Sequence, residues 1–260
     1  MRPRAMFLIL GSAFLAFAWS VAPAHPPKAD AAAIAISIAN PDRTAADRER
    51  DSWAKPQVVL DFLEARPGMQ VIDYLAGDGY YSDLLGRIVG ATGQVIVFNN
   101  AGYAAYMGQE LTQRFAGRRV PNTLFKVTEI AALKLPPNSL DAALFVRAYH
   151  DVYYTPDGAA GPMGDASTMI ANLYTALKQG GVVVVQDHVA NAGSDPVESV
   201  NKLHRIDPAI VKHTFEQAGF KLEAQDGTFG NPADDHSKLV FDPAIRHQTD
   251  QFMYRFRKPK

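Results

Sequence analysis

The sequence predicts an α/β fold in which helices cover both faces of a mostly parallel, doubly wound sheet. Short apolar runs alternate with segments of helical periodicity from about residue 56 onward. One of these runs, GVVVVQDH at 181–188, is β-branched over its first half, as expected for a strand covered on both sides. The first run, ending at Leu75, enters a glycine turn that opens a helix.

The segment before the sheet is predicted to be helical. Prolines at 26 and 27 mark an extended leader, and an alanine–isoleucine run follows. A charged and then amphipathic stretch comes next and stops at Arg66-Pro67-Gly68. We expect one or two helices that pack across the edge of the main domain. The domain boundaries are a leader and helical segment at 25–55 and the α/β domain at 56–260.

The elements of the α/β domain follow in order. We expect strands at 70–75, 93–100, 123–129 and 181–188, and a further strand somewhere within 138–151. We expect helices at 80–89, 103–117, 165–181 and 207–220, with Asp165 or Ser167 capping the third of them and Gly180 stopping it. A final strand pair is predicted at 221–227 and 251–258, joined by a long loop.

The N-terminus has the three-part pattern of a secretory signal peptide over residues 1–24. Basic MRPR is followed by an apolar run and by small residues at Ala22 and Ala24. An uncleaved membrane anchor is the alternative, because the run approaches the length of a span. We expect an exported protein, periplasmic or secreted, whose mature chain starts near His25, with membrane contact only through the signal peptide if it stays uncleaved.

Composition narrows the function classes. The 260 residues carry a formal net charge of -1, which argues against nucleic acid as a partner. The chain has no cysteine, which excludes disulfides, thiolate nucleophiles and Cys-ligated zinc. The oligomeric state is not readable from the sequence.

The chemistry of the first turn selects between two kinds of nucleoside. Gly77-x-Gly79-x-x-Ser82 nearly matches a dinucleotide fingerprint. However, Asp73 precedes the turn and Asp78 lies within it, and two carboxylates would repel a pyrophosphate. The sulfonium and ammonium groups of S-adenosylmethionine suit such a turn better, and glycines would still let the backbone pass close to the ligand.

The motifs VIDYLAGDGYYSDLL, GQVIVFNN, LPPNSLDAALFV and LKQGGVVVVQDH together resemble those of class I S-adenosylmethionine-dependent methyltransferases. The segments AYHD, QDHVANAGS and TDQFMYRFRKP resemble a bacterial family of exported predicted methyltransferases. The resemblance implies a Rossmann-like seven-stranded sheet with an antiparallel last strand, and S-adenosylmethionine as methyl donor. The donor-binding residues that it implies are Asp73, Leu75, Ala76, Gly77, Gly79, Tyr80, Asn99, Asn100 and Glu129. Leu75 departs from the family pattern, which has a glycine there, and Asn99 replaces an acid.

Four titratable residues follow two strands that should be neighbours: His150, Asp151, Asp187 and His188. We interpret them as the catalytic group, in which a histidine held by an acid removes a proton from the acceptor. A divalent metal bound by Asp187 with His150 or His188 is a second interpretation, and a structural hydrogen-bond network is a third. The predicted site includes no metal. His204 could join this group, but we expect it to cap the next helix, and we expect residues 153–167 to form a flap.

The predicted function is in-line methyl transfer to a small-molecule acceptor. Two alternatives stay open. One is an exported, non-catalytic binding module with a degenerate methyltransferase fold, for which Leu75 and Asn99 are the relevant features. The weaker one is an NAD-dependent oxidoreductase.

Overall fold

The computed structural model describes residues 28–118 and 120–260. The predicted signal peptide and its cleavage site lie outside these residues. Within the described part of the chain, no helix is both long and apolar enough to cross a membrane.

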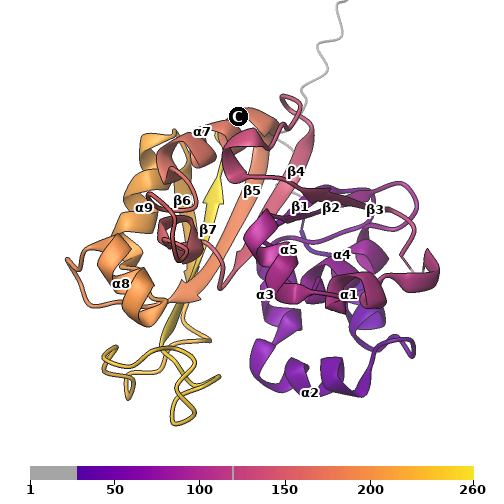
Figure 1. Ribbon diagram of the computed structural model, residues 1–260. Coiled ribbons are helices and arrows are strands. Elements are labelled where there is room, and N and C mark those ends of the chain that lie inside the picture. The colour runs from indigo at the N-terminus through magenta and orange to yellow at the C-terminus, as the bar shows by residue number, and fades with distance from the viewer. Residues whose placement is uncertain (1–27, 119) are drawn as a thin grey trace, which may run out of the picture.

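Seven strands form one sheet in the order β3-β2-β1-β4-β5-β7-β6 (Figure 1). Their bounds are β1 (Gln70–Tyr74), β2 (Gln94–Asn99), β3 (Thr123–Val127), β4 (Leu140–Val146), β5 (Leu177–His188), β6 (Lys221–Asp226) and β7 (Gln251–Arg257). All neighbouring pairs from β3 to β5 are parallel, whereas β7 is antiparallel to both β5 and β6. The predicted sheet with its antiparallel last strand is therefore confirmed.

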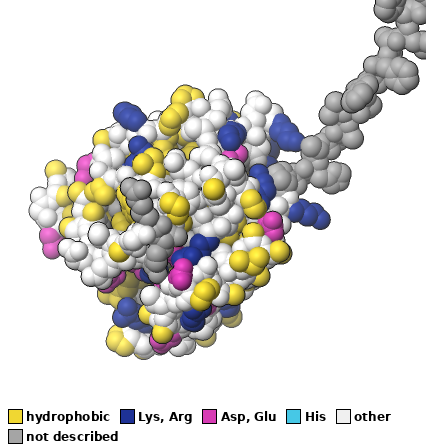
Figure 2. All heavy atoms as spheres, turned by 90° about the vertical axis from the view of Figure 1, so that its right-hand side faces the viewer, with side chains coloured by type: hydrophobic (Ala, Val, Ile, Leu, Met, Phe, Trp, Pro, Cys, Tyr) yellow, Lys and Arg dark blue, Asp and Glu magenta, His cyan; other side chains and the backbone are white. Residues whose placement is uncertain are grey.

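Strand β3 forms one edge of the sheet. Its side chains Leu124, Phe125 and Val127 are exposed. Figure 2 views the molecule from the side on which β3 lies in Figure 1 and shows hydrophobic side chains scattered between charged ones. Because β3 is short, the unpaired edge that it offers is small.

Nine helices and three short 3-10 turns accompany the sheet in the described residues. The helices are α1 (Ala31–Ile38), α2 (Ala45–Ala54), α3 (Pro56–Phe62), α4 (Tyr80–Val89), α5 (Ala101–Met107), α6 (Glu110–Arg114), α7 (Ala166–Ala176), α8 (Pro196–Leu203) and α9 (Pro208–Gln217). The 3-10 turns are η1 (Ala116–Arg118), η2 (Ile130–Ala132) and η3 (His150–Tyr153).

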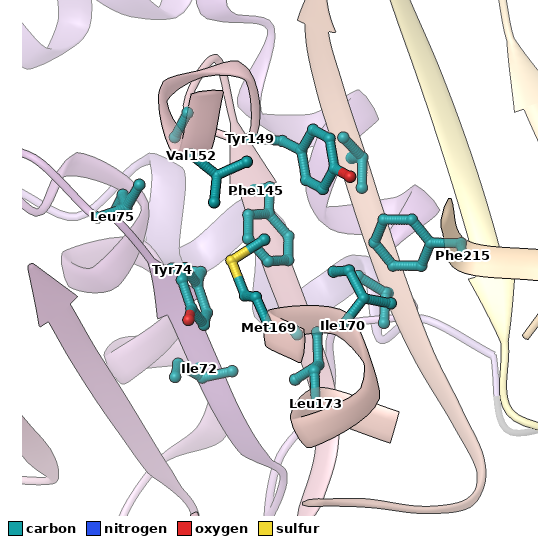
Figure 3. Packing of buried hydrophobic residues seen from close by; sticks show 14 of the residues in the cluster. Ile72, Tyr74, Leu75, Phe145, Tyr149, Val152, Met169, Ile170, Leu173 and Phe215 are labelled. Carbon is teal, nitrogen blue, oxygen red and sulfur yellow. The ribbon is translucent and has the colours of Figure 1, made fainter. Parts of the chain in front are cut away.

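Each face of the sheet has its own hydrophobic core. Side chains of α1, α3 and α4 pack with Val71 and the other residues of β1, β2, β4 and β5 that point to that face. Ile72, one position along β1, points the other way and packs under α7 and α9. Figure 3 shows this second core, which includes Met169 of α7 together with Tyr74 and Phe145, whose stacked rings have centroids 4.7 Å apart.

The N-terminal helices lie on a face of the sheet rather than across its edge, which corrects the prediction. Ile34 of α1 is fully buried, and the Ser37 hydroxyl donates to the Leu84 carbonyl of α4 at 2.9 Å. Helix α2 continues toward the carboxyl ends of the strands. There Arg50 reaches the first glycine turn, so this segment contributes to the candidate site.

Two predicted helices are shorter than expected. The helix predicted at 103–117 is divided into α5 and α6, because Gly108 takes a φ of 52° that ends the first of them. Helix α7 has the predicted Asp165 cap but ends at Ala176, not at Gly180. The chain is already extended at Leu177, which is buried and pairs with Leu140, so β5 starts earlier than predicted.

Candidate functional site

The side chain of Asn99, at the end of β2, hydrogen-bonds to the turn after β1. The Asn99 Oδ1 atom accepts from the Gly77 amide at 2.9 Å, and Nδ2 donates to the Gly77 carbonyl at 2.9 Å. Leu75, at the expected glycine position, takes a left-handed φ of 53°, and Ala76 donates its amide to the Phe98 carbonyl. The amide of Asn99 thus does what a carboxylate could not, since a carboxylate has no proton to donate.

Asp73 is buried at the end of β1. Its Oδ2 accepts a hydrogen bond of 2.6 Å from the Ser82 hydroxyl. Burial raises the pKa of Asp73 to about 7, against the opposing effect of the Ser82 hydrogen bond and with a further raising effect of the Asp78 charge. Its carboxyl is therefore only partly ionised at neutral pH.

Asp78 supplies no unpaired charge to the turn, which corrects the expectation of two free carboxylates. Arg50 and Arg114 pair with it at 3.1 and 2.7 Å. Burial would raise the pKa of Asp78, but the two arginines outweigh this and lower it. Its Oδ1 also accepts from the Tyr80 amide at 3.3 Å, at the start of α4.

The α5–α6 segment, residues 101–115, covers the turn. A Cβ atom added to Gly79 would lie 2.7 Å from Phe115 and 2.9 Å from Leu111, and one added to Gly77 would lie 3.8 Å from the Met107 sulfur. Arg114 also donates to the Asp78 carbonyl at 2.7 Å. Gly79 is therefore needed because protein atoms pack against it, whereas the left-handed φ of 60° is what favours glycine at Gly77.

The remaining predicted donor residues have separate surroundings. Asn100 caps α5 through the Tyr103 amide and donates to the Met163 sulfur at 3.1 Å. Tyr80 is buried and hydrogen-bonds Asp51 of α2, so its hydroxyl points away from the turn. Glu129 follows β3 and is exposed. The structure thus gathers Asp73, Asn99, Asn100 and the turn itself, and leaves Glu129 outside this group.

A second cluster lies where β4 and β5 end. The Asp187 carboxylate accepts from the His150 amide at 2.9 Å and lies 2.7 Å from His150 Nδ1. The other ring nitrogen, His150 Nε2, lies 3.2 Å from Asp151 Oδ1 and 3.3 Å from His204 Nδ1. Tyr103 of α5 donates its hydroxyl to Asp151 Oδ2. The structure therefore brings together His150, Asp151 and Asp187 as predicted.

The raised pKa of His150 weighs against its predicted role as a general base. Burial alone would lower its pKa, but Asp151 and Asp187 outweigh burial and raise the pKa to about 10. The imidazole is thus already protonated at neutral pH and has no free lone pair with which to accept a proton.

His188 differs from its neighbour in both contacts and charge. Its Nδ1 lies 2.8 Å from the Thr249 hydroxyl, and its amide donates to Asp187. Burial and the nearby charge of His150 lower the pKa of His188 well below its usual value. His188 is therefore a neutral residue that connects β5 to the start of β7.

Three residues outside the predicted catalytic and donor-binding sets join the site. His204 caps the end of α8, not the following helix, and also joins the cluster. Tyr103 reaches the cluster from α5.

Arg147 lies 4.5 Å over the Trp53 ring, and no ion pair to its guanidinium is found within residues 28–118 and 120–260. Burial lowers the pKa of Arg147 to about 10, with a contribution from Arg50. The LHRID motif was the available signal for His204, whereas the contacts of Tyr103 and Arg147 depend on the tertiary structure.

A cavity of about 850 Å³ opens beside the turn, between α2 and α6. Its lining includes Arg50, Trp53, Asp78 and Arg114. The cavity therefore lies on the side of Asp78 where Arg50 and Arg114 pair with it, and side chains of both charges line it.

Neither a protein-family model nor a curated protein matches the chain. Solved structures resemble it at low sequence identity. A SAM-dependent methyltransferase from Aquifex aeolicus is 17% identical over 89% of this chain and 100% of its own, with a TM-score of 0.56. A phosphoethanolamine N-methyltransferase of Haemonchus contortus in complex with S-adenosyl-L-methionine is 14% identical over 80% of this chain and 53% of its own, with a TM-score of 0.57.

The [4+2]-cyclase SpnF is also similar, at 17% identity over 85% of both chains and a TM-score of 0.56. One architecture therefore carries different chemistries, and likeness at this identity establishes the fold only. Strand order, the antiparallel β7 and these likenesses agree: the chain has the Rossmann-like fold of the SAM-dependent methyltransferases.

Proposed function

We propose that the protein is an S-adenosylmethionine-dependent methyltransferase that acts on a small-molecule acceptor. The observation that carries the proposal is Asp73, a buried carboxyl at the end of β1 beside a glycine turn, in a sheet of methyltransferase topology. A cationic ligand stabilises the ionised form of such a group, since opposite charges attract strongly where water is excluded.

The same turn disfavours a dinucleotide. A pyrophosphate binds the free amides at a helix N-terminus. Here the Asp78 carboxylate already accepts from the Tyr80 amide at the start of α4. The Tyr80 amide is therefore not free to bind a phosphate, which argues against the NAD-dependent alternative.

Donor binding requires the α5–α6 segment to withdraw from the turn. In the proposed complex Asp73 faces the donor's ammonium, Asn99 and Asn100 contact the ribose, and Glu129 contacts the adenine. Asn99 would then exchange its two Gly77 hydrogen bonds for ribose hydroxyls. Segment 101–115 is suited to such a movement, because neither α5 nor α6 has a buried residue and Phe115 is the one buried side chain of the segment.

The acceptor would bind where β4 and β5 end. Its nucleophilic atom would attack the donor's methyl carbon as the carbon–sulfur bond breaks, sulfur would keep the electron pair as a neutral thioether, and a proton on the acceptor atom would pass to water. Positioning and exclusion of water would supply most of the rate enhancement. Arg147 is the residue at this end of the sheet that suits a negatively charged group of the substrate.

Calorimetric titration tests the proposal. We expect S-adenosylmethionine and S-adenosylhomocysteine to bind well below about 1 mM, with NAD failing to bind. Asp73→Asn should weaken S-adenosylmethionine binding, whereas Asp61→Asn on α3 should leave it unchanged. Dissociation constants of about 1 mM or weaker for both adenosyl ligands would reject the methyltransferase.

A specific observation favours the second candidate, a binding module that has lost transfer. The turn is closed by protein groups, namely the Asn99 amide and the side chains of Leu111 and Phe115. Under this candidate segment 101–115 stays in place, and hydrogen exchange of its amides would be the same with and without S-adenosylmethionine. A change in exchange on ligand addition supports the methyltransferase instead.

We also propose that the protein is exported, on the signal-peptide pattern of residues 1–24. N-terminal sequencing of the protein from a periplasmic or culture fraction should start near His25. An intact Met1 in that protein would contradict cleavage.

A further inference from the structure

Three side-chain atoms meet beyond the end of β4. Two come from η3, directly after β4, and one comes from the residue that caps the end of α8. They are His150 Nε2, Asp151 Oδ1 and His204 Nδ1, and they lie 3.2, 3.3 and 3.3 Å from one another. They therefore form a nearly equilateral triangle. Two imidazole nitrogens and one carboxylate oxygen form a ligand set typical of divalent transition metals.

We propose that His150, Asp151 and His204 bind one divalent transition-metal ion, with Zn²⁺ as the representative ion. The proposal is independent of the methyl-transfer chemistry proposed above. It also changes the ligands from those the sequence offered, because Asp187 lies behind His150 and not in the triangle.

The size of the triangle fits an ion without movement of the side chains, and the ion would displace the proton from His150 Nε2. Ligands about 2.1 Å from a metal are separated by about 3.4 Å in a tetrahedral site and by about 3.0 Å on one face of an octahedron. The observed separations of 3.2 and 3.3 Å lie between these values. An ion in contact with all three atoms would lie about 0.9 Å from their plane and keep positions on its far side open.

In His150 and Asp151, the polar side-chain atom that does not face the triangle already has a partner in the protein. Asp187 lies 2.7 Å from His150 Nδ1, which directs Nε2 into the triangle. Tyr103 donates to Asp151 Oδ2, which leaves Oδ1 for the ion. A carboxylate behind a metal-binding histidine is the usual outer-shell partner, because it fixes the ring and raises its basicity.

His204 is held in place by its backbone and by its neighbours. It ends α8 with φ 52° and ψ 49°, a conformation that helix ends usually assign to glycine or asparagine. The rings of Tyr154 and Phe241 lie 5.3 and 5.1 Å from its own. The His204 side chain is 21% exposed, against 3% for His150, so an ion can enter from its side.

Titration calorimetry of the chelator-treated full chain with Zn²⁺ tests the site. We expect one ion per chain, and His204→Gly should weaken Zn²⁺ binding by at least about 100-fold, more than loss of an outer-shell partner does. Glycine is chosen because it accepts the left-handed backbone of residue 204. Asp187→Asn should weaken binding by about 10- to 100-fold.

The matched control is His213→Ala, since His213 is an exposed histidine on the neighbouring α9. This variant should bind Zn²⁺ like the unmodified protein. Equal affinity of the unmodified protein and His204→Gly, or no binding stronger than about 1 mM, would overturn the proposal.

One measurement needs no variant and so is unaffected by a folding failure. Co²⁺ added to the unmodified protein should shift the imidazole proton resonances of two histidines and give a visible absorption band of low-symmetry coordination. Shifts confined to His236, which pairs with Asp250 at the surface, would also overturn the proposal.

Discussion

Asn99 illustrates how one atom changes the role of a position. Where an acid would leave the turn free to receive a ribose, the amide ties both polar groups of Gly77 to the end of β2. Asp73, one strand away, is kept partly neutral by burial. At the residue scale the turn is therefore more closed and less charged than its sequence suggests.

We expect Asn99→Asp to destabilise the fold by about 1–3 kcal/mol, because a carboxylate would face the Gly77 carbonyl without a proton to donate. Urea denaturation measures the difference. Asn100→Asp is the matched control, since aspartate caps helix α5 as well as asparagine does. Equal losses for the two variants would show that the Gly77 contacts do not account for the effect.

The raised pKa of Asp73 predicts how stability changes with pH. The carboxyl has a pKa of about 7 in the folded protein against 3.8 for the model compound, so the folded state holds the extra proton between these values. Its contribution to stability therefore falls as pH rises from about 4 to about 7. Asp73→Asn should gain stability relative to the unmodified protein between pH 5 and pH 8 in urea denaturation. A constant difference across this range would contradict the assignment.

At the scale of elements, the α5–α6 segment determines whether the turn is accessible. Leu111 and Phe115 rest on Gly79, while Arg114 holds Asp78. Tyr103 ties the same segment to Asp151 in the second cluster. Movement of this one segment would therefore affect both the turn and the histidine cluster.

We expect Gly79→Ala to lower stability by about 1–3 kcal/mol and to loosen segment 101–115. The new methyl group would lie 2.7 Å from Phe115, and the φ of 81° is unfavourable for alanine. Gly158→Ala is the control, because Gly158 has a similar φ of 77° but nothing within 4 Å of the added atom. Thermal unfolding and amide exchange measure both; equal losses would mean that backbone strain alone is responsible.

Across the whole molecule, Arg205 fastens the long connection between β6 and β7 to the sheet. It is fully buried and pairs with Asp234 at 2.8 Å, and it donates to the carbonyls of Val189 and Lys238. Residues 227–250 contain no helix or strand, so this contact is central to their order. The connection in turn brings Thr249 to His188 at the edge of the site.

Asp234→Ala should therefore destabilise the protein by about 3–5 kcal/mol, because it leaves the Arg205 charge buried without a partner. The neighbouring Asp235→Ala is the control, since Asp235 lies at the surface. Urea denaturation compares the two variants. A loss below about 1 kcal/mol for Asp234→Ala would show that water replaces the ion pair.

The sequence by itself determined the order of the strands along the chain, the glycine turn and the convergence of His150, Asp151 and Asp187. These features follow from local periodicity and from the rule that parallel strands end at one edge. Only the tertiary structure decided that Arg50 and Arg114 neutralise Asp78, that Tyr103 and His204 join the histidine cluster, and that two aspartates stabilise the protonated form of His150. Each of these depends on side chains from distant segments, whose distances and burial set the local charge, and no periodicity in the sequence encodes those distances.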